Sequence, residues 1–168
     1  MGARRLMLLR HAKSSWRGDE GDHERPLNAR GEAATRLMGA HLAAEPPPDL
    51  VLCSTATRAR ATLAGLTSLD TCETLFERRL YLAPEARLLA RLQALEAERQ
   101  CVLLIAHNPG LQYLAAMLAS EADRALAERM VGKYPTAALA TFDLRPGDWE
   151  ALGPSQVLTA TLVTPKSL

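Results

Sequence analysis

The chain is poor in cysteine and has none of the spacings that make cysteine informative. Three cysteines are present, an odd number, and no paired Cys/His spacing of the kind that binds zinc accompanies them. Cys53 and Cys101 fall in apolar runs typical of buried strands, and Cys72 lies outside such runs. We therefore interpret the cysteines as small hydrophobic residues of a reducing cytosol, rather than as a disulfide framework or metal site.

Long hydrophobic runs and a dominant charge are also missing. The apolar stretch 6–9 is too short for the core of a secretion signal, and no run approaches the length of a membrane span. The formal net charge is +1, which gives no overall field toward nucleic acid or an anionic membrane. We expect a soluble, cytoplasmic protein without a nucleic-acid or membrane partner.

The rest of the composition is that of an ordinary globular protein. Hydrophobic residues make up 48% of the 168 residues, and no internal repeat or low-complexity segment interrupts them. This length predicts a single domain over 1–168 with a proper core. The prolines at 46–48 are interpreted as a stiff connector between two elements, since three successive prolines cannot continue a helix.

Apolar runs and helical periodicities alternate along the chain. Runs without polar alternation predict strands buried on both faces, and two later, threonine-richer runs suit edge or antiparallel strands. Alternation of strands and helices predicts an α/β fold, a three-layer α/β/α sandwich with a mainly parallel central sheet. The predicted strands are 5–9, 49–53, 101–106, 138–144 and 157–163, and the predicted helices include residues 34–42, 57–69, 88–95 and 111–118.

Potentially cationic side chains follow three of the predicted central strands. Arg10 and His11 end the first, Arg58 comes shortly after the second, and His107 follows the third, with no carboxylate among these strand ends. Ligands of such sheets bind beyond the carboxyl ends of the strands. The pattern therefore predicts a site for an anion, and a phosphoryl group is the commonest small one.

Local helix signals support an anion site. Asn108 followed by Pro109 predicts a helix start with Asn as the cap, which would place His107 beside a helix N-terminus. Arg58 falls in the first turn of a predicted helix, where the dipole disfavours a positive charge unless an anion is bound. Taken singly, His11 suits a structural role and Arg58 a surface ion pair, so the prediction depends on their conjunction.

An ordered set of motifs resembles a known family. The segment LRHAKSSW at 9–16 is similar to the opening signature of the histidine phosphatase superfamily, with its phosphoglycerate mutase-like fold. The Ala-Lys after His11 resembles the small SixA-like branch. Four further segments match that branch in order, and they are RPLNARG at 25–31, STATRA at 54–59, VLLIAHNP at 102–109 and YPTAA at 134–138.

The resemblance implies a phosphohistidine mechanism that uses neither metal nor cofactor. His11 would attack phosphorus, Arg10, Arg58 and His107 would hold the phosphoryl oxygens, and Arg25 would be a further ligand. Arginine suits this role because its planar fork binds pairs of oxygens and keeps its charge. His11 must be neutral to attack, and we expect the neighbouring arginines to lower its pKa.

The general acid of larger family members has no clear counterpart. Glu85 is the candidate, with Glu77 and Asp22 weaker ones, and each also suits a solvated carboxylate. SixA-like relatives lack the usual acid, which matters least for a leaving group that departs easily. With a short chain and an open pocket, this favours protein phosphohistidine or a small phosphorylated metabolite as the substrate.

Three alternatives stay open at this point. The same fold could serve as a phosphate- or phosphoprotein-binding module without turnover. It could pass the phosphoryl group to a second substrate, as a phosphotransferase or mutase does. A metal hydrolase using His11 and His107 ranks last, because no Asp or Glu follows the same strand ends.

Overall fold

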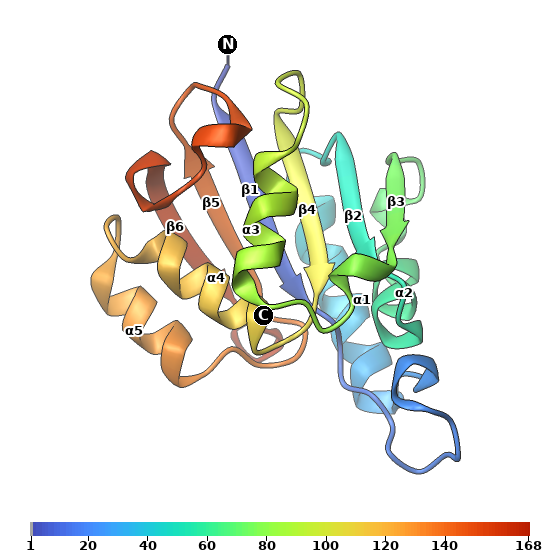
Figure 1. Cartoon of the computed structure of the whole chain (residues 1–168). Coiled ribbons are helices and arrows are strands. Elements are labelled where there is room, and N and C mark those ends of the chain that lie inside the picture. Colours follow the sequence, from blue (N-terminus) through green and yellow to red (C-terminus); the bar gives the residue numbers. More distant parts are fainter. Residues whose placement is uncertain (1) are drawn as a thin grey trace.

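A six-stranded mixed sheet forms the centre of the molecule. The computed structural model describes residues 2–168, and Figure 1 shows helices on both faces of the sheet. The strand order is β3-β2-β4-β1-β5-β6, with β3, β2, β4 and β1 parallel and with β5 and β6 joined antiparallel. The strands are β1 (Arg4–Arg10), β2 (Leu50–Ser54), β3 (Thr74–Glu77), β4 (Cys101–Ala106), β5 (Leu139–Leu144) and β6 (Val157–Val163).

Five α-helices make the two outer layers. In Figure 1, α3, α4 and α5 lie in front of the sheet, and α1 and α2 lie behind it. Together with the sheet they form the predicted three-layer sandwich. The helices are α1 (Ala29–Ala43), α2 (Thr57–Ala64), α3 (Glu85–Gln93), α4 (Gly110–Ala119) and α5 (Arg124–Gly132).

The central strands are buried on both faces, which explains their lack of polar alternation. Along β1, Leu6 and Leu8 belong to the cluster under α3 and α4, whereas Met7 and Leu9 belong to the cluster under α1 and α2. Successive side chains of a strand point to opposite faces, so a continuous apolar run supplies both cores. Because β2, β4 and β1 are neighbours and parallel, their carboxyl ends meet at one edge of the sheet.

The strands predicted from sequence are confirmed to within a residue or so at each end, including the two antiparallel ones. Two elements were not predicted. Strand β3 is a four-residue edge strand with half-exposed side chains, and its sequence TLFE carries no clear period. Helix α5 follows a short polar turn and buries only Leu126, Ala127 and Met130, so its apolar pattern is sparse.

The helix predicted over 57–69 was too long. Helix α2 ends at Ala64 with Gly65 as its C-cap, and a 3-10 turn over Thr67–Leu69 follows. A Cβ on Gly65 would lie 2.4 Å from the hydroxyl oxygen of Thr35, so the chain there passes close to α1. Within residues 2–168, no helix is long and apolar enough to cross a membrane.

Candidate active site

A cavity of about 260 Å³ opens at the carboxyl ends of β1, β2 and β4. The structure therefore brings together the strand ends that the sequence analysis expected to converge. Loops that follow the strands supply its walls, together with the segment 12–28 at the lower right of Figure 1. The lining residues are Arg10, His11, Lys13, Ser14, Trp16, Asp22, Arg25, Arg58, Leu82, His107, Asn108 and Thr136.

Backbone contacts fix His11 at the end of β1. The amide of Ala137 donates to the carbonyl oxygens of Arg10 and His11, at 3.0 and 3.1 Å. The amide of Ala12 donates to Thr62 Oγ1 at 2.9 Å, and Thr62 lies on α2. A strand end, a buried loop and a helix therefore hold one short segment, and a side chain on it is placed with little freedom.

A further contact decides which ring nitrogen of His11 is free. His11 Nδ1 lies 2.8 Å from the carbonyl oxygen of Ala12, which can only accept a hydrogen bond, so Nδ1 carries the proton. Nε2 then keeps its lone pair, toward which Arg58 Nε donates at 3.4 Å. Burial lowers the pKa of His11 to about 4, and Arg58, Arg10 and Arg25 act in the same direction. The predicted direction is right, but burial rather than the arginines is the main cause.

His107 lies beside His11, with ring centroids 5.1 Å apart. Its Nε2 is 2.7 Å from Ser54 Oγ, and its Nδ1 is buried without a hydrogen-bond partner among the described residues. Burial lowers the pKa of His107 to about 3, and the nearby His11 and Arg58 add to the effect. His107 therefore lines the cavity as a neutral imidazole beside His11.

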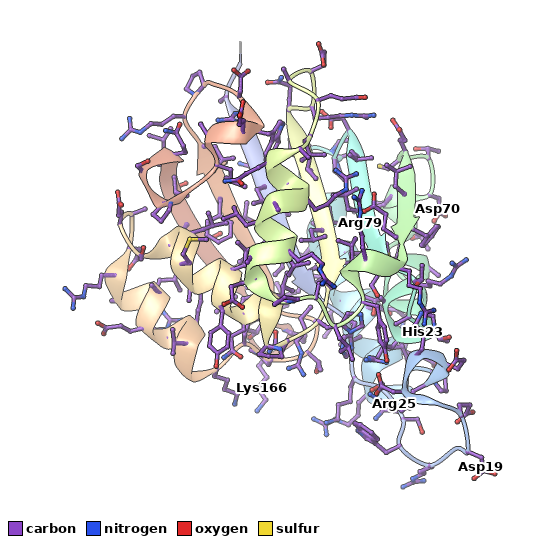
Figure 2. The ribbon with its side chains drawn as sticks, in the orientation of Figure 1. Asp19, His23, Arg25, Asp70, Arg79 and Lys166 are labelled. Carbon is purple, nitrogen blue, oxygen red and sulfur yellow. The ribbon has the colours of Figure 1, made fainter. Side chains whose placement is uncertain are left out.

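Arg58 and Arg25 meet a carboxylate in the cavity. Arg58 Nη2 lies 3.1 Å from Asp22 Oδ2, and Arg25 Nη2 lies 3.1 Å from Asp22 Oδ1. Arg58 is only 2% exposed and Arg25 8% exposed, so both guanidinium groups are largely removed from water. Figure 2 shows Arg25 on the loop below the sheet, where it reaches inward. Charges this far from water need an anionic partner, and Asp22 supplies it.

Asp22 is the carboxylate that the strand ends did not supply. Its pKa is lowered to about 2, first by the hydrogen bond from the Tyr81 hydroxyl and, against partial desolvation, by Arg58 and Arg25. At neutral pH it is therefore ionised and acts as an acceptor. From the sequence Asp22 was only one of the weaker acid candidates, since it also suited a solvated carboxylate of the polar loop.

Arg10 and Asn108 are held by one carbonyl group. Arg10 Nη1 donates to the Tyr134 carbonyl oxygen at 3.0 Å, and Asn108 Nδ2 donates to the same oxygen at 2.9 Å. The sequence predicted Asn108 as the cap of α4, and this prediction is wrong. Helix α4 begins at Gly110, after Pro109, and Asn108 makes no capping hydrogen bond there. Its side chain instead joins the His107 loop to the segment that precedes β5.

The two other acid candidates lie elsewhere. Glu85 is the exposed first residue of α3 and does not line the cavity. Glu77 is bound by Arg91 and Arg79 at 2.8 and 2.7 Å. Its burial favours the neutral form, but these hydrogen bonds prevail and lower its pKa to about 2. Of the three candidates, the structure places only Asp22 in the cavity.

A close approach of the backbone and a stacked pair of side chains shape the rim. A Cβ on Gly31 would lie 2.1 Å from the Lys13 carbonyl oxygen, so the start of α1 packs directly on the segment after His11. Trp16, which is 74% exposed, stacks on Arg25 with the guanidinium carbon 3.5 Å from the ring centroid. Within residues 2–168, no three His, Cys, Asp or Glu side chains gather in a group that could hold a metal ion.

The six-stranded mixed sheet between helical layers is the phosphoglycerate mutase-like fold. The SixA protein of Nakamurella multipartitia, assigned as a phosphohistidine phosphatase, superposes with a TM-score of 0.84 at 26% identity, over 98% of each chain. The SixA protein of Agrobacterium tumefaciens, with the same assignment, gives 0.76 at 32% identity, over 86% of this chain and 94% of that one.

Sequence comparison leads to the same group. Residues 6–81 match the model of the histidine phosphatase superfamily (branch 1). Protein Rv1276c of Mycobacterium tuberculosis is 38% identical over 149 residues, which span 87% of this chain and 92% of that protein. The chain belongs to the histidine phosphatase superfamily and is SixA-like. Both the family and its structural neighbours support phosphatase activity.

Proposed function

We propose that the chain is a metal-independent phosphohydrolase that works through a phosphohistidine on His11. The observation that supports this most directly is the hydrogen bond from His11 Nδ1 to the Ala12 carbonyl oxygen. It leaves a lone pair on Nε2 inside a cavity that Arg10, Arg25 and Arg58 also line. A neutral nitrogen nucleophile in a cationic cavity suits attack on a phosphoryl group.

The reaction takes two displacements. His11 Nε2 forms a bond to phosphorus while the bond between phosphorus and the leaving group breaks. A water molecule then attacks the phosphohistidine, phosphate leaves, and the lone pair returns to Nε2. The arginines and His107 hold the phosphoryl oxygens throughout, so most of the catalysis is positioning and charge stabilisation.

The cavity favours a substrate with an easily departing leaving group. Its volume of about 260 Å³ is enough for a phosphoryl group together with a small leaving group such as an imidazole ring. Asp22, which is ionised at neutral pH, offers no proton to a poor leaving group such as an alcohol. The substrate class that follows is a phosphoramidate, above all phosphohistidine on a protein, with small activated phosphates as the next choice.

Trapping the intermediate tests this proposal. The protein is incubated with phosphoramidate, quenched in alkali and digested, and the peptide that contains His11 is examined by mass spectrometry. We expect a phosphoryl group on His11 and turnover that persists in the presence of a chelator. The variant His11→Asn should show no phosphorylated peptide and no turnover. Turnover that survives in His11→Asn would overturn the mechanism, and binding without any phosphate release would show a binding module.

A further inference from the structure

A second hollow, larger than the catalytic cavity, adjoins it. Its volume is about 720 Å³, and it shares Lys13 and Thr136 with the catalytic cavity. The first half of α1, the end of α5, the segment before β5 and the segment after β6 form its walls. Figure 2 shows Lys166, one of its lining residues, at the same lower end of the molecule as Arg25. We call this hollow the basic groove.

The floor of the basic groove is apolar. Its apolar lining comes from Ala33, Ala34 and Leu37 of α1, from Leu162 of β6 and from Pro135. Leu37 belongs to the apolar repeat that predicted α1, yet it is 46% exposed, whereas Met38 on the same helix is fully buried. An apolar floor left open beside a catalytic cavity is typical of a surface that binds a ligand or partner.

The rim carries one sign of charge. The groove is lined by five cations and no carboxylate, and none of the five makes an ion pair within residues 2–168. The whole chain has a formal net charge of +1, so this excess is local. The cations are Lys13, Arg30, Arg129, Lys133 and Lys166.

Helix electrostatics do not account for the whole set. Arg129 and Lys133 lie at the C-terminal end of α5, where a positive charge is favoured. Arg30, in contrast, lies in the first turn of α1, where the dipole disfavours it. Arg58 shows the same feature in α2 and is paired with Asp22, but Arg30 has no such partner in the structure. An anion from another molecule would offset the unfavourable position of the Arg30 charge.

We propose that the basic groove docks an acidic segment of the protein that carries the phosphorylated residue. This inference rests on the proposed function, since the phosphorylated side chain would enter the catalytic cavity past Lys13 and Thr136. Four separate parts of the chain supply the cations around an apolar floor. That distribution fits an extended peptide with interspersed acidic and apolar side chains better than a compact polyanion, whose charge is concentrated at one point.

Labelled peptides test the docking. Two peptides of equal length carry a stable triazole analogue of phosphohistidine, flanked in one by Glu and Leu and in the other by Gln and Leu. Fluorescence anisotropy gives their dissociation constants with the full chain. We expect the acidic peptide to bind about tenfold more tightly at low salt, and the difference to shrink as added salt screens the rim charges.

Charge reversal locates the effect. Arg129→Glu and Lys166→Glu should each weaken binding of the acidic peptide about fivefold and leave turnover of phosphoramidate unchanged. Arg36→Glu is the matched control, because Arg36 is an exposed α1 residue without an ion pair that lies outside the groove. Two independent reversals keep the test valid if one variant folds poorly.

Equal binding of the two peptides would overturn the proposal, as would a preference that survives both reversals or is lost equally in Arg36→Glu. Inorganic triphosphate is the rival probe. If it binds more tightly than the acidic peptide and loses affinity in Arg129→Glu, the groove is a site for small polyanions instead. Failure of the chain to hydrolyse phosphoramidate would contradict the proposed function separately, because the anisotropy assay requires no turnover.

Discussion

The chemistry of the cavity depends on the protonation of a few side chains. His11 is neutral because it is buried, and its tautomer follows from a carbonyl oxygen one residue further on. Asp22 is ionised because Tyr81, Arg58 and Arg25 surround it. The cavity thus holds a neutral imidazole next to two arginines, Arg25 and Arg58, that are already paired with a carboxylate. A phosphoryl group must compete with the Asp22 carboxylate for those arginines.

This competition gives a prediction for Asp22→Asn. The amide keeps the size and hydrogen-bonding oxygen of the carboxylate but removes its charge, so a bound dianion is no longer repelled. We expect vanadate to inhibit the variant about fivefold more strongly than the unaltered chain, measured as an inhibition constant. Asp19→Asn is the control, since Figure 2 shows Asp19 at the outer tip of the same loop. Unchanged or weaker inhibition of Asp22→Asn would contradict the competition.

At the scale of elements, Tyr134 joins the strands that carry the site. Its hydroxyl group donates to the Leu8 carbonyl oxygen at 2.6 Å and accepts from the Ala140 amide at 3.1 Å, so it links β1 to β5. Its backbone carbonyl oxygen holds Arg10 and Asn108. Complete burial raises its pKa, so the hydroxyl group remains a donor at any physiological pH.

Tyr134→Phe should destabilise the fold at this junction. The substitution removes both hydrogen bonds of a buried hydroxyl group, a loss of about 1–3 kcal/mol in the free energy of unfolding. Urea denaturation measures it. Tyr113→Phe serves as the control, because Tyr113 is 47% exposed on α4 and its hydroxyl makes no hydrogen bond in the structure. Equal losses in the two variants would contradict the role of Tyr134.

The sequence predicted elements well where one signal dominated and poorly where two competed. Continuous apolar runs located β1, β2 and β4, because a strand that is buried on both faces has apolar side chains at every position. Asn108 has the composition of a helix cap, yet its side chain binds the Tyr134 carbonyl oxygen, a contact between residues 26 positions apart. The place of Asp22 in the site likewise depends on contacts between residues far apart in the sequence, because its loop is held by Arg58.

For the whole molecule, the buried histidines predict sensitivity to acid. The pKa values of His11 and His107 are about 4 and about 3, below the ordinary value of 6.5. Below pH 6.5 the unfolded chain therefore binds protons that the folded chain does not, and stability falls as the pH falls. Between pH 7 and pH 5 the loss is of the order of 2 kcal/mol per histidine.

Urea midpoints at pH 7 and pH 5 measure this dependence. The double variant H11N/H107N lacks both buried imidazoles, so its unfolding free energy should change much less over the same interval. A double variant that loses as much stability as the unaltered chain would show that other groups govern the acid response. Asp22 and Glu77 lose their contribution to stability mainly between their ordinary pKa values of 3.8 and 4.5 and their folded values of about 2, which lies below the interval between the two midpoints.

The carboxylate between Arg25 and Arg58 also sets a threshold for what the cavity admits. A singly charged metabolite or a halide ion gains little by taking guanidinium groups that a tethered carboxylate already occupies at 3.1 Å. A doubly charged phosphoryl group gains more from the same exchange. We therefore expect the loop that carries Asp22 to select doubly charged anions over the many singly charged anions of a cell.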